Sequence, residues 1–371
     1  DMVQGGAGTT INMNANEVIA NRALELMGHG RGEYQYCSPN DHVNCAQSTN
    51  DAYPSAFRYA FIRMNRSMEA ELKQLIDSLR KKGDEFSDSI KMGRTQLQDA
   101  VPMTSGQEFH AFANNLEEEI ENLERNVTLL YEINMGGTAI GTGLNAAAGY
   151  AELCIKKMCE LTGEPFVLAS DLIEATPDTG AYVSYSASLK RLAVKLSKMC
   201  NDLRLMASGP RCGLHEINLP PMAPGSSIMP GKVNPVIPEV TNQVCFKVIG
   251  NDTAVTFAAE AGQLQLNVME PIITECIFES ITWLQNVMKI LRTKCIDGIT
   301  INREHNLETV KHSIGIVTAL NPVIGYKAST KIAKEALETG KSVYNLVLEH
   351  ELMSKEQLDQ LLDPANMLAA H

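Results

Sequence analysis

Apolar side chains recur at steps of three and four residues along much of this 371-residue chain. This spacing places them on one face of an α-helix, which indicates helices that pack through an apolar stripe. Two stripes predict helices over residues 55–82 and 105–132. They consist of Phe57, Phe61, Met64, Met68, Leu72, Leu75 and Leu79, and then of Phe109, Phe112, Leu116, Ile120, Leu123, Val127 and Leu130. Such stripes are typical of near-parallel helix packing.

The same pattern returns in the second half of the chain. Leu189–Met206 carries a further stripe, a very long helix is predicted to start near Pro238, and another helix follows Pro271. Gly and Ala residues concentrate in residues 250–262, which lets neighbouring backbones approach closely at the centre of an oligomeric bundle. We therefore predict an all-α fold with a long-helix bundle as its core.

The predicted helices are shorter beyond Gly298, which indicates a small separate helical domain at the C-terminal end. The stretch before the first bundle helix is polar and irregular, as expected for the remainder of an N-terminal domain whose upstream part is absent. We accordingly expect three domains, comprising residues 1–48, residues 49–302 with the central bundle, and residues 303–371.

A long loop is predicted over residues 210–238, because seven of the fifteen prolines fall there and exclude a helix or a central strand. Loops of this length are usually functional or disordered. Ser226, Ser227, Lys232 and Asn234 place two hydroxyls, an ammonium and an amide within nine residues. This set suits removal of a weakly acidic C–H proton beside a carboxylate, with a serine as base and donors for the enediolate. The alternative is an ordinary surface loop with a solvated lysine.

Three polar residues, Ser48, Thr49 and Asn50, precede the first bundle helix, with Asp51 as the expected N-cap. Backbone amides and the helix dipole at such a position favour an anion, which here would be a carboxylate. The alternative is a simple capping cluster. A Gly- and Thr-rich stretch, Gly136–Asn145, interrupts the helical pattern further on, and we leave it outside the predicted site because a bend explains it equally well.

Composition narrows the classes of partner and compartment. The net charge of −12 and the pI near 5.2 argue against binding to nucleic acid or to anionic membranes. An anionic substrate must therefore find positive charge locally, and the candidates for supplying it are Lys232 and Arg94. No apolar run reaches membrane-spanning length, and the nine scattered cysteines suggest neither a zinc ribbon nor a disulfide framework, so we place the protein in the cytoplasm. The histidines are not spaced as a metal set, and we predict no metal and no organic cofactor.

Four spaced motifs resemble one known family. Gly225–Pro235 is similar to the signature of the fumarase/aspartase superfamily, and Gln47–Asp51, Gly93–Asp99 and Gly6–Asn14 match further blocks of that family in the same order. The resemblance covers essentially the whole chain. It implies a helical-bundle fold, a homotetramer with active sites at subunit junctions, and a further N-terminal segment, so we expect this chain to be part of a longer protein.

Within this superfamily the resemblance is closer to the aspartases than to the fumarases. Gln96 occupies a position where fumarases have a histidine, and Asn267–Pro271 resembles the aspartases where fumarases place an arginine in the fourth position. The resemblance therefore implies elimination of ammonia from L-aspartate to give fumarate. Two alternatives remain open, namely hydration of fumarate in the same superfamily and a catalytically inactive structural homo-oligomer.

The resemblance also implies roles for particular residues. Ser226 would take the β-proton of aspartate, and Lys232 with Asn234 would hold the α-carboxylate. The remaining implied contacts bind the β-carboxylate through Thr9, Ser48, Thr49 and Ser227, and surround the amine through Asn50 and Thr95. Gln96 would line the same site, but its amide cannot relay protons. The amine would then leave without a general acid, because it is already protonated.

Helix geometry bears on whether one chain can hold all these residues. Helices over 55–82 and 105–132 would each be about 40 Å long, and consecutive bundle helices normally run antiparallel. Ser48–Asn50 precede the first helix and Thr95 precedes the second, so they should lie near opposite ends of the bundle. The 22-residue connection leaves a return path open, since an extended chain of that length spans about 70 Å. The geometry favours sites assembled from more than one chain.

Overall fold

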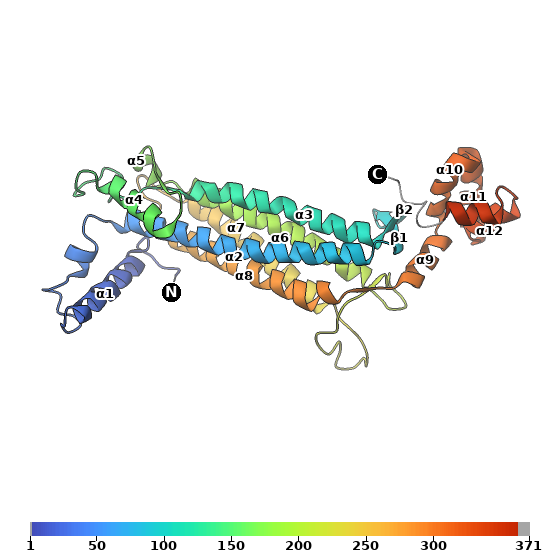
Figure 1. Cartoon of the computed structure of the whole chain (residues 1–371), viewed down its shortest axis with the longest axis horizontal. Coiled ribbons are helices and arrows are strands. Elements are labelled where there is room, and N and C mark those ends of the chain that lie inside the picture. The colour runs from blue at the N-terminus through green and yellow to red at the C-terminus, as the bar shows by residue number, and fades with distance from the viewer. Residues whose placement is uncertain (1, 363–371) are drawn as a thin grey trace. The chain divides into compact units, whose positions relative to one another are not determined.

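The computed structural model describes residues 2–362 and confirms the all-α fold with a long-helix bundle (Figure 1). Five helices within these residues contain 23 residues or more. They are α2 (Thr49–Glu85), α3 (Ser105–Val127), α6 (Gly180–Met206), α7 (Val236–Glu260) and α8 (Glu270–Lys294). The other helices of eight or more residues are α1 (Thr9–Leu26), α4 (Tyr150–Thr162), α9 (Arg303–His312), α10 (Val317–Ile324) and α11 (Tyr326–Thr339).

The predicted apolar stripes are the buried faces of these helices. On α2 the stripe residues Phe57, Phe61, Leu72 and Leu79 are almost completely buried. Met64 of α2 and Ile120 of α3 are half-buried, and the other stripe residues of α3 and α6 are buried. Burial of each such side chain contributes about 1.5 to 3 kcal/mol, so the stripes account for much of the stability of the bundle. The helix α2 starts at Thr49, which is earlier than the predicted start at residue 55.

The described chain divides into two compact units. One consists of Asp1–Leu72, Glu118–Leu196 and Gln243–Val287, and the other of Lys73–Glu117, Ser197–Asn242 and Met288–His371. In the first unit, Phe57, Phe61, Tyr182, Tyr185 and Phe278 form one aromatic cluster, with ring centroids 4.8 to 6.3 Å apart. The three-domain division at residues 48 and 302 stays a prediction.

A β-hairpin stands in the second unit where the sequence suggested only a linker. Strand β1 (Ile90–Thr95) pairs with β2 (Gln98–Thr104) in antiparallel register, and a bulge lies between Met92 and Arg94. Gln96 and Leu97 form the turn with positive φ angles of 55° and 60°, which matches the two-residue turn that hairpins prefer. The hairpin therefore presents Thr95 and Gln96 at its tip.

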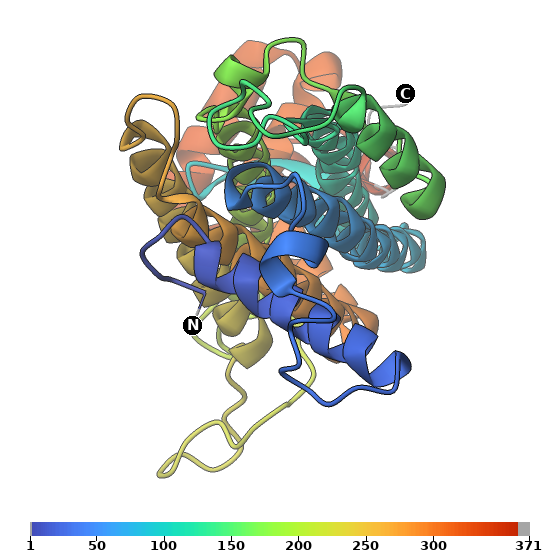
Figure 2. The ribbon, with the colours of Figure 1, turned by 90° about the vertical axis from the view of Figure 1, so that its left-hand side faces the viewer.

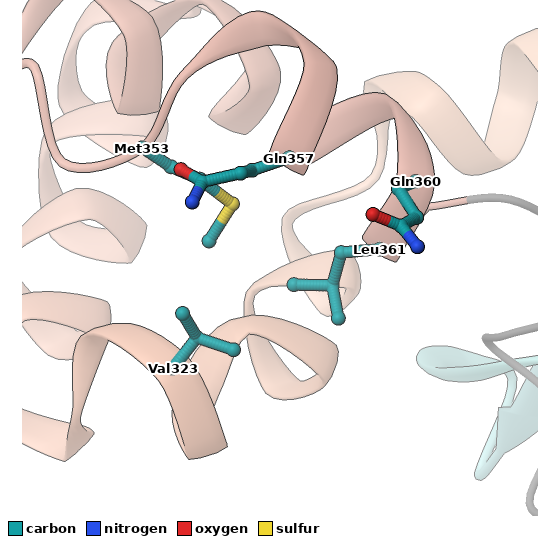
Figure 3. A pocket seen from close by; sticks show the side chains of 5 residues that line it. All are labelled: Val323, Met353, Gln357, Gln360 and Leu361. Carbon is teal, nitrogen blue, oxygen red and sulfur yellow. The ribbon is translucent and has the colours of Figure 1, made fainter.

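Strand β1 and the short helices of the C-terminal part share a separate hydrophobic core. Ile90 and Met92 of β1 pack with buried residues of α9, α10, α11 and α12 (Val343–Glu349). The last described helix, α13 (Lys355–Leu361), begins at a capping box between Ser354 and Gln357. A cavity of about 430 Å³ in this part is lined by Val323, Met353, Gln357, Gln360 and Leu361, none of which is ionisable. Figure 3 shows how these side chains lie around it. This cavity offers no acid, base or charge for catalysis.

The proline-rich segment is a long loop, as predicted. Figures 1 and 2 show it leaving the end of α6 and returning to α7, in the colours between green and yellow. It contains only the short strand β5 (Ile217–Asn218), which pairs with β6 (Thr300–Ile301). Among the described residues, 2–362, no helix is both long and apolar enough to cross a membrane.

The burial pattern of α6 gives a test of the bundle. Leu192 is fully buried, whereas Val194, two residues away on the same helix, is 51% exposed. Leu192→Ala should lower the free energy of unfolding by about 2 to 5 kcal/mol, because it removes buried methyl groups and leaves a cavity. Val194→Ala should change it by less than about 1 kcal/mol. Urea unfolding measures both values, and equal losses would contradict the assignment of the buried face.

Candidate active site

The loop residues Gly225–Asn234 form a ring that is closed by their own contacts. The side-chain amide of Asn234 donates a hydrogen bond to the carbonyl of Gly225 at 2.6 Å. Gly225 also passes so close to the carbonyl of Lys232 that a Cβ atom at this position would overlap it. A side chain other than hydrogen is therefore excluded at position 225. This ring fixes the backbone on both sides of Ser226.

Ser226 is half-buried, and its hydroxyl oxygen accepts hydrogen bonds from two backbone N–H groups. The donors are Ile228 and Met229, at 3.2 and 3.1 Å from Oγ. Hydrogen bonds to the charged form of a group favour that form, so this pair of donors would stabilise an alkoxide formed at Ser226. Ser227 and Lys232 are exposed beside it.

A second group of predicted residues lies in the other compact unit, where α1 meets the start of α2. The Nδ2 of Asn12 on α1 donates to the Thr49 hydroxyl at 3.0 Å. Because Thr49 accepts this bond, its own proton stays available for an acceptor such as a carboxylate. Thr9 is the first residue of α1 and is exposed. It follows Gly8, whose left-handed φ of 87° and close contact with the Tyr53 ring both require glycine.

The sequence predicted Asp51 as the N-cap of α2, and this prediction is wrong. The helix starts at Thr49, and the hydroxyl of Ser48 accepts from the N–H of Asn50 at 3.2 Å. Asp51 instead lies inside the first turn with its side chain fully buried, and its Oδ1 accepts from the N–H of Ser48 at 3.0 Å. Burial raises the pKa of the Asp51 carboxyl, while the backbone N–H groups around it act to lower that pKa.

The stretch Gly136–Asn145, which we had left outside the site, lies directly against it. The Nδ2 of Asn50 donates to the carbonyl of Ala139 at 2.8 Å, and Asp51 Oδ2 accepts from the N–H groups of Gly136 and Thr138 at 3.2 and 2.8 Å. Sequence reasoning missed this contact because its partners are 85 to 89 residues apart.

One sequence signal for this contact exists four residues after Asn50. Pro54 lies inside α2 and has no N–H, so it leaves the Asn50 carbonyl without its helical donor. The Nδ2 of Asn134 donates to that carbonyl at 3.0 Å instead. Pro54 therefore marks the point on α2 at which the segment with Asn134 is attached.

The hairpin supplies the third group of predicted residues. Thr95 ends β1, and Gln96 is exposed in the turn. Arg94, which had been a candidate for binding a substrate anion, forms an ion pair with the buried Glu216. Lys91 Nζ lies 2.7 Å from the other oxygen of Glu216. Arg94 is thus neutralised within the protein, and Lys232 is the exposed cation of the two candidates.

The predicted residues fall on three segments, which belong to two compact units. Thr9 and Ser48–Asn50 belong to the first compact unit, whereas the hairpin tip and the ring 225–234 belong to the second. Within residues 2–362, no group of three or more His, Cys, Asp or Glu side chains is arranged to hold a metal ion. The chemistry available is that of a hydroxyl base, amide and hydroxyl donors, and a lysine.

Comparison with known proteins identifies similar chains of known family. The family model described as "Lyase" matches residues 1–250, and the one described as "Fumarase C C-terminus" matches residues 316–369. An aspartate ammonia-lyase of Pseudomonas aeruginosa is 61% identical over 370 residues, which are 100% of this chain and 78% of that protein.

Two solved structures show the same fold. A Brucella melitensis protein described as fumarate lyase:delta crystallin, bound to cobalt, gives a TM-score of 0.96 at 52% identity, over 99% of this chain and 80% of that chain. A class II fumarase from Schistosoma mansoni gives 0.90 at 35% identity, also over 99% of this chain and 80% of that chain. The identity is thus higher to the aspartate ammonia-lyase than to this fumarase.

One buried acid in the first compact unit, Glu270, should make the stability of the protein depend on pH. Glu270 is the first residue of α8 and is 3% exposed. Burial raises the pKa of its carboxyl from 4.5 to about 8, although the positive charge of Arg58 acts to lower that pKa. Between these two pKa values the folded chain keeps a proton that the unfolded chain has released. The free energy of unfolding should therefore fall as pH rises through this window, by up to about 1.4 kcal/mol per pH unit.

Glu270→Gln should remove this contribution, because the amide does not titrate. Urea unfolding at several pH values between 4.5 and 8 would show a shallower decrease for this variant than for the parent protein. The exposed Glu124→Gln serves as the control and should leave the slope unchanged. Identical slopes for the parent and Glu270→Gln would show that Glu270 ionises normally.

Proposed function

This chain belongs to the fumarase/aspartase superfamily, and from that premise we propose how its residues catalyse the reaction. It is a lyase that eliminates ammonia from aspartate to give fumarate, as its full-length similarity to aspartate ammonia-lyases at about 60% identity supports. The observation that carries the proposed mechanism is the position of Ser226, whose oxygen receives two backbone N–H groups in a closed ring.

We assign to Ser226 the role of the base. Its alkoxide removes the β-proton of L-aspartate, and the electron pair of the C–H bond moves into the adjacent β-carboxylate to form an enediolate. The enediolate then collapses, a C=C bond forms, and the C–N bond breaks with its electron pair going to nitrogen. Because the amine starts as an ammonium, it leaves as neutral ammonia, and the step needs no general acid. The Ser226 proton passes to solvent.

Hydroxyl and cationic donors hold the two carboxylates. The Thr49 hydroxyl, with Thr9, Ser48 and Ser227, receives the β-carboxylate, where negative charge develops. Lys232 and Asn234 bind the α-carboxylate on the other side. Charge-assisted hydrogen bonds of this kind are about twice as strong as neutral ones, which supplies locally the positive charge that an acidic protein lacks overall.

The remaining proposed contacts surround the amine. Asn50 and Thr95 lie around it, and Gln96 lines the site from the hairpin turn. An amide orients its neighbours but transfers no proton, which agrees with departure of the amine as ammonia.

We further propose a homotetramer in which each active site draws on more than one chain. The helix α2 has 37 residues, so its ends are about 55 Å apart. Ser48–Asn50 stand at its beginning and Thr95 follows its end. Phe246 and Phe257 on α7 support association, because they are 60% and 69% exposed and eleven residues, or three helical turns, apart. None of the nine cysteines, all of which lie within residues 2–362, forms a disulfide, and this fits the cytoplasmic location that we propose.

The assay for this function measures fumarate by its ultraviolet absorbance after addition of L-aspartate and, separately, of L-malate. Ser226→Ala should lower turnover on aspartate by about 10² to 10⁴-fold, because it removes the base. Circular dichroism should show an unchanged fold, since the residue lies in a loop. The exposed Ser87→Ala is the control and should keep parental turnover. Near-parental turnover of a folded Ser226→Ala protein would refute the assignment, and release from malate alone would identify a fumarase.

Shared active sites predict complementation between two inactive variants. Thr49→Val lacks a carboxylate donor and Ser226→Ala lacks the base, so each homotetramer should be inactive. Co-refolded hybrids contain some junctions that draw only intact residues, and their fumarate release should recover to a fraction of the parental value. Each variant refolded alone provides the control. Hybrids that mass spectrometry verifies but that stay inactive would place all the catalytic residues in one chain.

A further inference from the structure

The side chain of Asn50 has a defined orientation in this structure. Its Nδ2 donates to the carbonyl of Ala139 at 2.8 Å. A carbonyl oxygen only accepts hydrogen bonds, so the NH₂ end of the amide must face it, and this contact fixes which end is nitrogen. The Oδ1 of Asn50 therefore points away from Ala139 as an acceptor.

The segment that carries Ala139 is held firmly on both sides. Asp51 is fully buried and accepts from the N–H groups of Gly136 and Thr138. On the other side Gly141 is buried against the backbone of Leu172, so closely that a Cβ atom would overlap the Leu172 carbonyl. Ala139 is thus placed between two anchored points.

The same segment also fixes the backbone of Asn50. Because Pro54 has no N–H, the Asn50 carbonyl accepts from Asn134, two residues before Gly136. One loop therefore determines the position of the Asn50 main chain and the rotation of its side-chain amide. Held in this way, Asn50 keeps its Oδ1 available on the side that faces away from Ala139.

We propose that the Gly136–Asn145 loop determines specificity for an amine by turning the Asn50 oxygen toward the leaving group. This inference rests on the proposed function, in which Asn50 lies beside that group. An ammonium carries three donors and no acceptor, so it pairs with Oδ1 and would be repelled by the NH₂ end. Asp51 and Gly141 are positioning residues, since they act through the loop and Asn50 and do not contact the substrate.

The test compares two ligands that differ only in the amine. L-aspartate has it, and succinate, measured as a competitive inhibitor, is the same dicarboxylate without it. Gly141→Ala must displace the loop, and it should raise the KM for aspartate about 10-fold or more, the size expected when a charge-assisted hydrogen bond is lost. The inhibition constant of succinate should change by less than about 2-fold. Asn50→Ala should give the same pattern.

Two further variants keep the inference falsifiable if Gly141→Ala folds poorly. Asn134→Ala removes the donor to the Asn50 carbonyl and should show the same selective loss with a smaller amplitude, whereas the exposed Thr142→Ala in the same loop should change neither constant. A merely structural loop would instead weaken both ligands equally or affect only the melting temperature, and either outcome overturns the inference. A parent protein that releases no fumarate from aspartate would instead refute the proposed function.

Discussion

The uninterrupted helix α2 is the constraint on which the rest of this structure depends. Its 37 residues carry the apolar stripe of the bundle, its first turn holds Thr49 and Asn50, and Ser48 directly precedes it. A rigid helix cannot bring its two ends together. In the proposed mechanism, the groups at its start and the hairpin after its end therefore serve one substrate through association of chains. The apolar residues exposed on α7 are consistent with such association.

Backbone N–H groups converge on a side-chain oxygen in two of the candidate regions. The ring around Ser226 aims two N–H groups at its oxygen, and the carboxylate of Asp51 accepts three N–H groups at the start of α2. In both places the fold holds the donors in position, and at Ser226 the proposed mechanism uses them to stabilise the alkoxide. Arg94 shows the opposite use of charge, since Glu216 neutralises it in the interior.

The long helices could be predicted from the sequence, because the stripes of α2, α3 and α6 follow helical spacing. The prolines were sufficient to locate the loop that contains Ser226. The predicted start of α2 was too late because aspartate is a residue type typical of N-caps, whereas Asp51 lies within the first turn of the helix. The hairpin was missed because Gln96 and Leu97 adopt positive φ angles without glycine. The contact of Asn50 with Ala139 depends on tertiary structure, which local patterns do not encode.

The most direct test of the account is a crystal structure of the Ser226→Ala variant with bound L-aspartate. The account predicts that one ligand contacts Ser48–Asn50 of one chain and the loop residues Lys232 and Asn234 of another, with the β-carbon facing position 226 and the amine facing Asn50 Oδ1. A ligand held entirely by residues of one chain, or bound away from position 226, would contradict it.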